Sequence, residues 1–223
     1  MLHAPVQSRA RATLGRVLAA TEELLRTRAY ADVSLSAIAS AAGVTTGAIF
    51  ARFADKDSLL LALDEWLATA ITLEADKVLD PAAWAHAPLE ASLERLFQAT
   101  IRIHRQHAGV IRAVGARRDY PPLRDRLNAA NRDRGERVRK CVGAAPGQPP
   151  RPPSDPAVDL ALLMCVSVIR ETIVFGGYWP QRLPGTDRAL ARELARAFAA
   201  QISASPAALR RSPRRARRSQ ATK

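Results

Sequence analysis

The stretch GVTTGAIFARFADKD, residues 43–57, holds side chains suited to binding a polyanion. It begins with a glycine and two adjacent hydroxyl residues, Thr45 and Thr46, and it carries an arginine between Phe50 and Phe53. Unpaired backbone N–H groups in the first turn of a helix, together with the positive end of the helix dipole, suit a phosphate group. Small side chains in that turn would also let the backbone come close to DNA. We therefore interpret this stretch as a contact surface for nucleic acid.

Short helical segments must hold this stretch in place. Apolar side chains recur at intervals of three and four residues across 14–25, which predicts a first amphipathic helix. Ser34 is placed to cap a second helix, SLSAIASAA, and Gly43 to end it. Thr45 is the next capping residue, and we expect it to open a third helix through Phe53. Two short helices joined by a tight turn predict a helix-turn-helix, whose later helix enters the major groove of DNA.

The apolar residues of the third helix indicate how it is held. Val44, Ile49 and Phe53 should face back onto the first two helices and fix the crossing angle of the third. Asp55 or a neighbouring residue should then start a fourth helix with an apolar stripe that includes Leu59 and Leu63.

The remaining chain also shows helical patterns. No strand pattern competes with them, so we expect an all-α protein of about nine helices. The proline-rich stretch 145–153 predicts a loop, and the segment beyond Pro206 has too few apolar residues to fold alone. The further predicted helices cover about 88–107, 109–115, 120–142, 156–176 and 186–203.

Composition and charge exclude several classes of protein. The net charge is +13, of which residues 209–223 contribute +7 and the rest of the chain +6. No segment has the roughly 18 consecutive apolar residues that cross a bilayer, and the N-terminus does not resemble a secretory signal. We therefore expect a cytoplasmic protein that does not bind membranes. Cys141 and Cys165 lack metal-type spacing, so we expect free thiols and no metal.

Residues 14–63 resemble the N-terminal DNA-binding domain of the tetracycline-repressor (TetR) family of bacterial transcriptional regulators. The resemblance spans about the first third of the chain. Its matching positions are Tyr30, Ser34, Ile38 and Ala39, the AlaGlyVal at 42–44, Gly47, the Ile-Phe-x-x-Phe at 49–53, and Lys56 with Asp57 before two leucines.

The resemblance implies a division of the chain into two domains and a tail. Residues 8–54 would form the DNA-binding domain, with the helix-turn-helix at about 34–53. Residues 55–205 would form a helical domain that binds an inducer and makes a homodimer, and 206–223 would be a disordered arginine-rich tail. The dimer would form through the last two helices, about 156–176 and 186–203, and would bind a near-palindromic double-stranded operator without any cofactor.

The resemblance also assigns roles to single residues. Phe50 replaces a frequent tyrosine whose hydroxyl touches phosphate, whereas Arg52 adds a full charge where histidine or tyrosine is common. Lys56 matches a lysine that contacts phosphate. Ala29 stands where glycine is usual, so a left-handed residue at the end of the first helix would be costlier here. The candidate DNA-binding residues are Ser34, Thr45, Thr46, Gly47, Ala48, Phe50, Arg52 and Lys56.

A repressor released by an apolar or aromatic small molecule is the function this resemblance favours. Apolar pockets form between helices, with a few polar groups that orient the ligand. An alternative is a DNA-binding regulator with no small-molecule inducer, controlled by a protein partner or by abundance. No enzyme is expected, because no triad, paired carboxylates or glycine-rich phosphate loop is present. The candidate ligand residues are Trp66, Phe97, Ile101, His104, Met164, Val168, Glu171 and Phe175.

Overall fold

The structure is a computed structural model that describes residues 4–147, 156–176 and 183–204, and these residues form helices with no strand among them. The predicted all-α class is thereby confirmed. The predicted tail and most of the proline-rich stretch lie outside the described residues. The elements are α1 (Ala4–Leu25), the 3₁₀ turn η1 (Tyr30–Asp32), α2 (Leu35–Ala42), α3 (Thr46–Phe50), α4 (Lys56–Asp76), α5 (Pro81–Ala85), α6 (Leu89–Gln106), α7 (Ala108–Ala116), α8 (Pro121–Ala144), α9 (Pro156–Ile169), the π-helical turn η2 (Arg170–Val174) and α10 (Asp187–Ala204).

Two elements differ from the sequence-based expectation. The short helix α5 was not predicted, although Asp80 and Pro81 are typical of a helix start. The Asp80 carboxylate accepts from the Ala82 N–H at 3.0 Å, and the buried Trp84 indole donates to the Val78 carbonyl at 2.7 Å. The predicted helix 156–176 is α-helical only to Ile169 and then widens into the π-helical turn η2.

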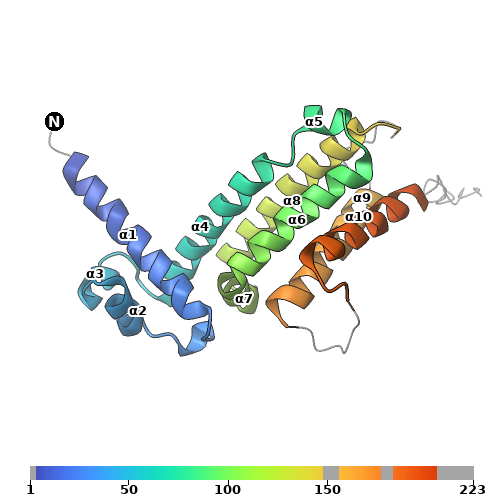
Figure 1. The fold of residues 1–223 in the computed structure, drawn as a ribbon. Coiled ribbons are helices and arrows are strands. Elements are labelled where there is room, and N and C mark those ends of the chain that lie inside the picture. The colour runs from blue at the N-terminus through green and yellow to red at the C-terminus, as the bar shows by residue number, and fades with distance from the viewer. Residues whose placement is uncertain (1–3, 148–155, 177–182, 205–223) are drawn as a thin grey trace, which may run out of the picture.

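Figure 1 shows how the helices are arranged. Helices α1, α2 and α3 form a group at one end, and α4 leads from this group towards α5. Helices α6 and α8 run alongside α4, and α10 packs against both α6 and α9. No described helix has the length and apolar content needed to cross a membrane. Helix α4 is thus the element that joins the N-terminal group to the rest of the molecule.

Two apolar clusters form the core. The first combines Ile38, Ile49 and Phe53 of the N-terminal group with Leu63 of α4, and it continues into α7 through Val110. The second cluster fills the space between α6, α8, α9 and α10, where the Phe97 and Phe198 rings lie 6.0 Å apart. The first cluster therefore crosses the domain boundary expected at 54–55, because α4 and α7 complete the core of the N-terminal group.

The contact between α1 and α7 is close. A Cβ placed on Gly109 would lie 2.3 Å from the Leu25 carbonyl oxygen, so only glycine lets the two helices approach this far. The buried His107 Nδ1 lies 2.5 Å from a carboxylate oxygen of Glu22 on α1. Arg112 donates to the carbonyl of Leu25 at 3.4 Å and to that of Val174 at 2.9 Å. These contacts fix the N-terminal group against the C-terminal helices.

Candidate nucleic-acid interface

Helix α2 is capped at both ends as the sequence predicted. The Ser34 hydroxyl accepts a hydrogen bond from the Ala37 N–H at 3.1 Å. Gly43 ends the helix in the left-handed region, with φ 62° and ψ 41°, which a residue with a Cβ rarely adopts. The N–H of Val44 then returns to the Ala39 carbonyl at 3.0 Å. This tight turn directs the chain into α3.

Helix α3 buries one side and exposes the other. The Thr45 hydroxyl accepts from the Ala48 N–H at 3.1 Å and thus caps the helix, as predicted. Ile49 and Phe53 are only 1% and 4% exposed, and the partly buried Val44 packs against the same core. The three side chains therefore face the preceding helices, which confirms the expected orientation.

The end of α3 differs from the prediction. The helix ends at Phe50 rather than at Phe53, although the Phe53 N–H still donates to the Ile49 carbonyl at 2.8 Å. Asp55 begins α4 directly afterwards through a capping box, in which its carboxylate accepts from the Ser58 N–H at 2.7 Å. The Ser58 hydroxyl in turn accepts from the Asp55 N–H at 3.2 Å. Because Asp55 must leave the helical conformation to make this cap, α3 cannot continue into it.

Most of the candidate DNA-binding residues of the helix-turn-helix are exposed. The Arg52 guanidinium makes no hydrogen bond or ion pair with any other described residue, and Phe50 is 57% exposed. The first turn of α3 is made of the small, exposed residues Thr46, Gly47 and Ala48. The exposed candidates are Ser34, Thr45, Thr46, Gly47, Ala48, Phe50 and Arg52.

Lys56 differs from the other candidates because its ammonium group binds the protein itself. It donates to the Tyr30 carbonyl at 2.6 Å and to the Ala31 carbonyl at 3.2 Å, and it lies 4.6 Å from the centre of the Tyr30 ring. Burial, aided by the nearby Asp57 carboxylate, raises the pKa of Tyr30, so its hydroxyl remains a donor. Sequence reasoning missed this partnership, because the two residues lie 26 positions apart and no periodic pattern connects them.

The turn after α1 forms without a residue in the left-handed conformation, which would have been costly for Ala29. Ala29 is extended, with φ −70° and ψ 149°, and no described residue other than glycine has a positive φ. The chain instead makes the 3₁₀ turn η1, in which the Asp32 N–H donates to the Ala29 carbonyl at 3.0 Å. An alanine at this position is therefore compatible with the motif.

The eight candidate ligand residues lie in different surroundings. Phe97 and Ile101 belong to the C-terminal core, whereas Met164, Val168 and Phe175 are between 38% and 49% exposed. The others are partly buried, and the Trp66 ring meets His107 edge-on, with ring centres 5.4 Å apart.

His104 is held as a neutral side chain. Its Nδ1 lies 2.8 Å from the Thr100 carbonyl, which can only accept, so this nitrogen carries the proton. Burial lowers the pKa of His104, and the positive charges of Arg170 and Arg134 lower it further. The imidazole can therefore offer a hydrogen-bond acceptor at Nε2 but no charge at neutral pH.

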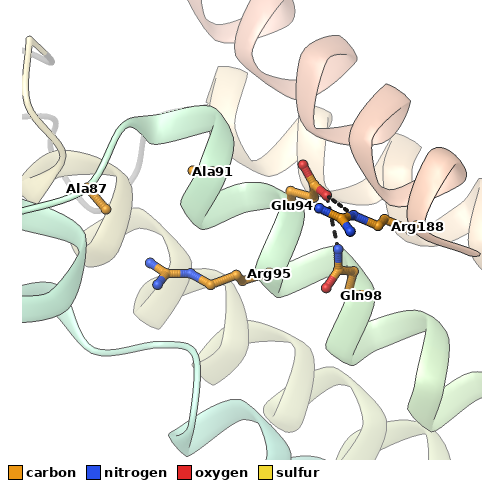
Figure 2. Close-up of a pocket in the computed structure, with 6 residues that line it drawn as sticks. All are labelled: Ala87, Ala91, Glu94, Arg95, Gln98 and Arg188. Atoms are coloured by element: carbon orange, nitrogen blue, oxygen red, sulfur yellow. Dashed lines mark hydrogen bonds and ion pairs between the residues drawn. The ribbon is translucent and has the colours of Figure 1, made fainter.

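Among the pockets of the described residues, two lie between helices of the C-terminal part. The larger has a volume of about 410 Å³ and is shown in Figure 2. In it, Glu94 of α6 pairs with Arg188 and accepts a hydrogen bond from the Gln98 amide at 3.0 Å. Arg95 points away from that pair. The smaller, of about 240 Å³, lies between α4 and α8. None of the eight candidate ligand residues lines either pocket. The lining of the smaller pocket consists of Asp64, Leu67, Ala68, Ile71, Arg126, Leu127, Ala129, Ala130 and Arg134.

A capped pair of short helices that buries its apolar side and exposes a small, hydroxyl-bearing edge defines a helix-turn-helix DNA-binding protein. Residues 17–63 match the family model described as bacterial regulatory proteins, tetR family. Residues 17–63 thus form a DNA-binding domain of the TetR type, and the chain is similar to TetR-family transcriptional regulators. No curated protein matches the chain.

Solved structures show the same fold over most of the chain. A TetR-family regulator from Mesorhizobium loti MAFF303099 is 16% identical, with 87% of this chain and 97% of that chain covered and a TM-score of 0.59. One from Streptomyces coelicolor is 20% identical, with 85% and 82% covered and a TM-score of 0.62. A transcriptional regulator from Aquifex aeolicus VF5 is 16% identical, with 84% and 98% covered and a TM-score of 0.55. At these identities the likeness concerns the fold.

Proposed function

We propose that the protein represses transcription by binding a near-palindromic operator as a homodimer, and that a small molecule releases it. The observation that carries operator binding is the exposed first turn of α3, whose opposite side is anchored by Ile49 and Phe53. Two such heads, about 34 Å apart, would enter successive major grooves on one face of the duplex.

The exposed residues divide into two kinds of DNA contact. Thr46 and Ala48 offer a hydroxyl and methyl groups, which suit base edges such as the thymine methyl. Arg52 is exposed and would pair with a backbone phosphate, which fixes the position of the protein without reading sequence. Lys56 holds the fold of the head through Tyr30, and any phosphate contact it makes would add to that role.

The surface of α9 supports the proposed homodimer. Leu160, Leu163, Met164 and Val168 follow one another along the helix at intervals of three, one and four residues, and each is at least 38% exposed. Apolar side chains gathered on one exposed helix face are typical of a surface that another subunit covers. Met164 and Val168, predicted as ligand residues, are therefore better placed to contact a second copy of the chain.

A regulator without a small-molecule inducer is the second candidate function. It is supported by the interior of the C-terminal part, where the predicted ligand residues Phe97 and Ile101 pack into the core. The pocket between α4 and α8 supports ligand control instead, because α4 also carries the Lys56 contact to the DNA-binding head. A ligand there would release DNA only if it preferred the conformation that does not bind DNA.

The dependence of DNA affinity on salt tests the proposed interface. Arg52→Met should weaken binding to any duplex and reduce the slope of log affinity against log salt by about 0.9 for each phosphate that the variant no longer neutralises. Arg132→Met is the matched control, because Arg132 is an exposed arginine on α8, remote in sequence from the helix-turn-helix. Fluorescence anisotropy with a labelled duplex gives both slopes. If Arg52→Met and wild type have equal slopes, Arg52 does not contact phosphate.

A further inference from the structure

The pocket between α4 and α8 has apolar walls. Leu67, Ala68 and Ile71 line it from one face of α4, and they follow Asp64 at the spacing of successive helical turns. Leu127, Ala129 and Ala130 line it from α8. Walls of this kind favour an apolar body in the pocket rather than a sugar or a free inorganic ion.

One of the charges at the pocket is already neutralised. The Asp64 side chain is buried, and its carboxylate accepts from the Arg126 Nε at 3.1 Å. The same guanidinium reaches Glu65 at 3.0 Å through Nη1. Arg126 therefore already pairs with two carboxylates of α4 and is poorly placed to bind a further anion.

Arg134 is a cation without such a partner. Its Nη2 donates to the neutral Asn131 amide oxygen at 2.6 Å, and no carboxylate of the described residues lies within 4 Å of its guanidinium. Burial lowers the pKa of Arg134, while Asp64 and Asp133 act in the opposite direction from a greater distance. A partly buried guanidinium with free donors favours an oxyanion, since such a pair restores the hydrogen bonds that burial takes away from water.

We propose that this pocket binds a small monocarboxylate with an apolar body, whose carboxylate pairs with Arg134 and whose body contacts α4 and α8. The volume of about 240 Å³ is below the roughly 300–1,000 Å³ of sites for drug-sized molecules, which fits a compact acid. A dianion such as phosphate is disfavoured, because one unpaired arginine faces it and the Asp64 carboxylate lies beside it. This pocket would be where the small molecule proposed above binds, and its role in regulation rests on that proposed function.

Binding to the full chain in the absence of DNA tests this site. Isothermal titration would compare benzoate and hexanoate with benzamide, the neutral counterpart of benzoate, and with inorganic phosphate. We expect benzoate to bind at least about tenfold more tightly than benzamide, as a charged hydrogen-bonded pair predicts. Phosphate should not bind at the same concentrations. Equal affinity for benzoate and benzamide, or no binding of either carboxylate at millimolar concentration, would overturn the inference.

Three variants locate the binding. Arg134→Met should abolish the preference for benzoate over benzamide, whereas Arg132→Met, an exposed arginine on the same helix that does not line the pocket, should keep it. Ala130→Leu should weaken the binding of both benzoate and benzamide, because the larger side chain fills the pocket. It is the deciding variant if circular dichroism shows that Arg134→Met does not fold. Retention of the preference in Arg134→Met, or unchanged binding in Ala130→Leu, contradicts the site. Because these titrations contain no DNA, their failure leaves the proposed operator binding standing.

Discussion

Tyr30 and Lys56 bind each other in both directions. The Tyr30 hydroxyl donates to the Lys56 carbonyl at 2.5 Å, and the Lys56 ammonium donates to the Tyr30 carbonyl at 2.6 Å while it lies over the Tyr30 ring. The pair connects the turn before the helix-turn-helix to the first residue of α4. The DNA-binding head is thus fastened to the helix that leads into the C-terminal domain.

We expect Lys56→Met to destabilise the head. The change removes two hydrogen bonds and a cation–π contact, so the free energy of unfolding should fall by about 1–2 kcal/mol. Arg52→Met, which removes an exposed charge instead, should stay within about 0.5 kcal/mol of wild type. Urea unfolding followed by circular dichroism measures both. A Lys56→Met protein as stable as wild type would show that the pair contributes nothing to the fold.

The contact of Gly109 with Leu25 predicts that the domain junction tolerates no side chain. Gly109→Ala would force backbone movement against α1, because its Cβ would meet the Leu25 carbonyl oxygen at 2.3 Å, and should cost about 1–3 kcal/mol. Gly15→Ala is the matched control, since its Cβ meets nothing within 4 Å and removing a helical glycine should stabilise by about 0.5–1 kcal/mol. Thermal unfolding should therefore shift in opposite directions for the two proteins. A shared direction would contradict the close approach of α1 and α7.

Two exposed leucines test the proposed dimer surface. Leu163 on α9 and Leu73 on α4 are 63% and 59% exposed, so a charge at either position should be tolerated by the folded monomer. Leu163→Asp should shift the protein towards monomer, because it places a carboxylate in the apolar face of α9. Leu73→Asp should leave the dimer intact. Sedimentation velocity at several concentrations measures this, and a dimer that persists in Leu163→Asp would place the interface elsewhere.

The buried thiols predict a loss of stability at high pH. Burial raises the pKa of Cys141 to about 11 and that of Cys165 to about 12. Both are above the ordinary value of 9.0, so above pH 9 the unfolded chain binds fewer thiol protons than the folded one. The neutral thiols contribute their full share to the free energy of unfolding below pH 9, and this contribution is lost as the pH rises through 11–12. Comparison of wild type with Cys165→Ala by urea unfolding at pH 8 and pH 10 should show a smaller pH effect in the variant.

Local sequence signals were sufficient to predict the helix caps of the DNA-binding head and its buried side. Ser34, Thr45 and Asp55 cap the helices that they were expected to cap, because a capping side chain bonds a backbone N–H only two or three residues away. The burial of Ile49 and Phe53 followed from helical spacing in the same way. The expected length of α3 was wrong, since the Asp55 cap competes for the residues that would have extended it.

Features that depend on distant residues were not predicted. The Tyr30–Lys56 pair and the Glu22–His107 contact join positions 26 and 85 residues apart. Periodic patterns in the sequence do not predict contacts over such separations. Helix α9 is apolar on more than one side, so its pattern could not separate core residues such as Cys165 from exposed ones such as Met164. The pocket at Arg134 was missed for another reason, because an arginine in a charged helix looks like an ordinary solvated residue.

Selection of bound fragments from a pool of random DNA duplexes, with wild type and Thr46→Ala in parallel, tests the central claim most directly. We predict that wild type enriches a near-palindrome whose half-sites lie about one helical turn apart, and that Thr46→Ala prefers a different base within each half-site. Enrichment of no motif by wild type, or of an identical motif by both proteins, would contradict recognition of DNA through the first turn of α3.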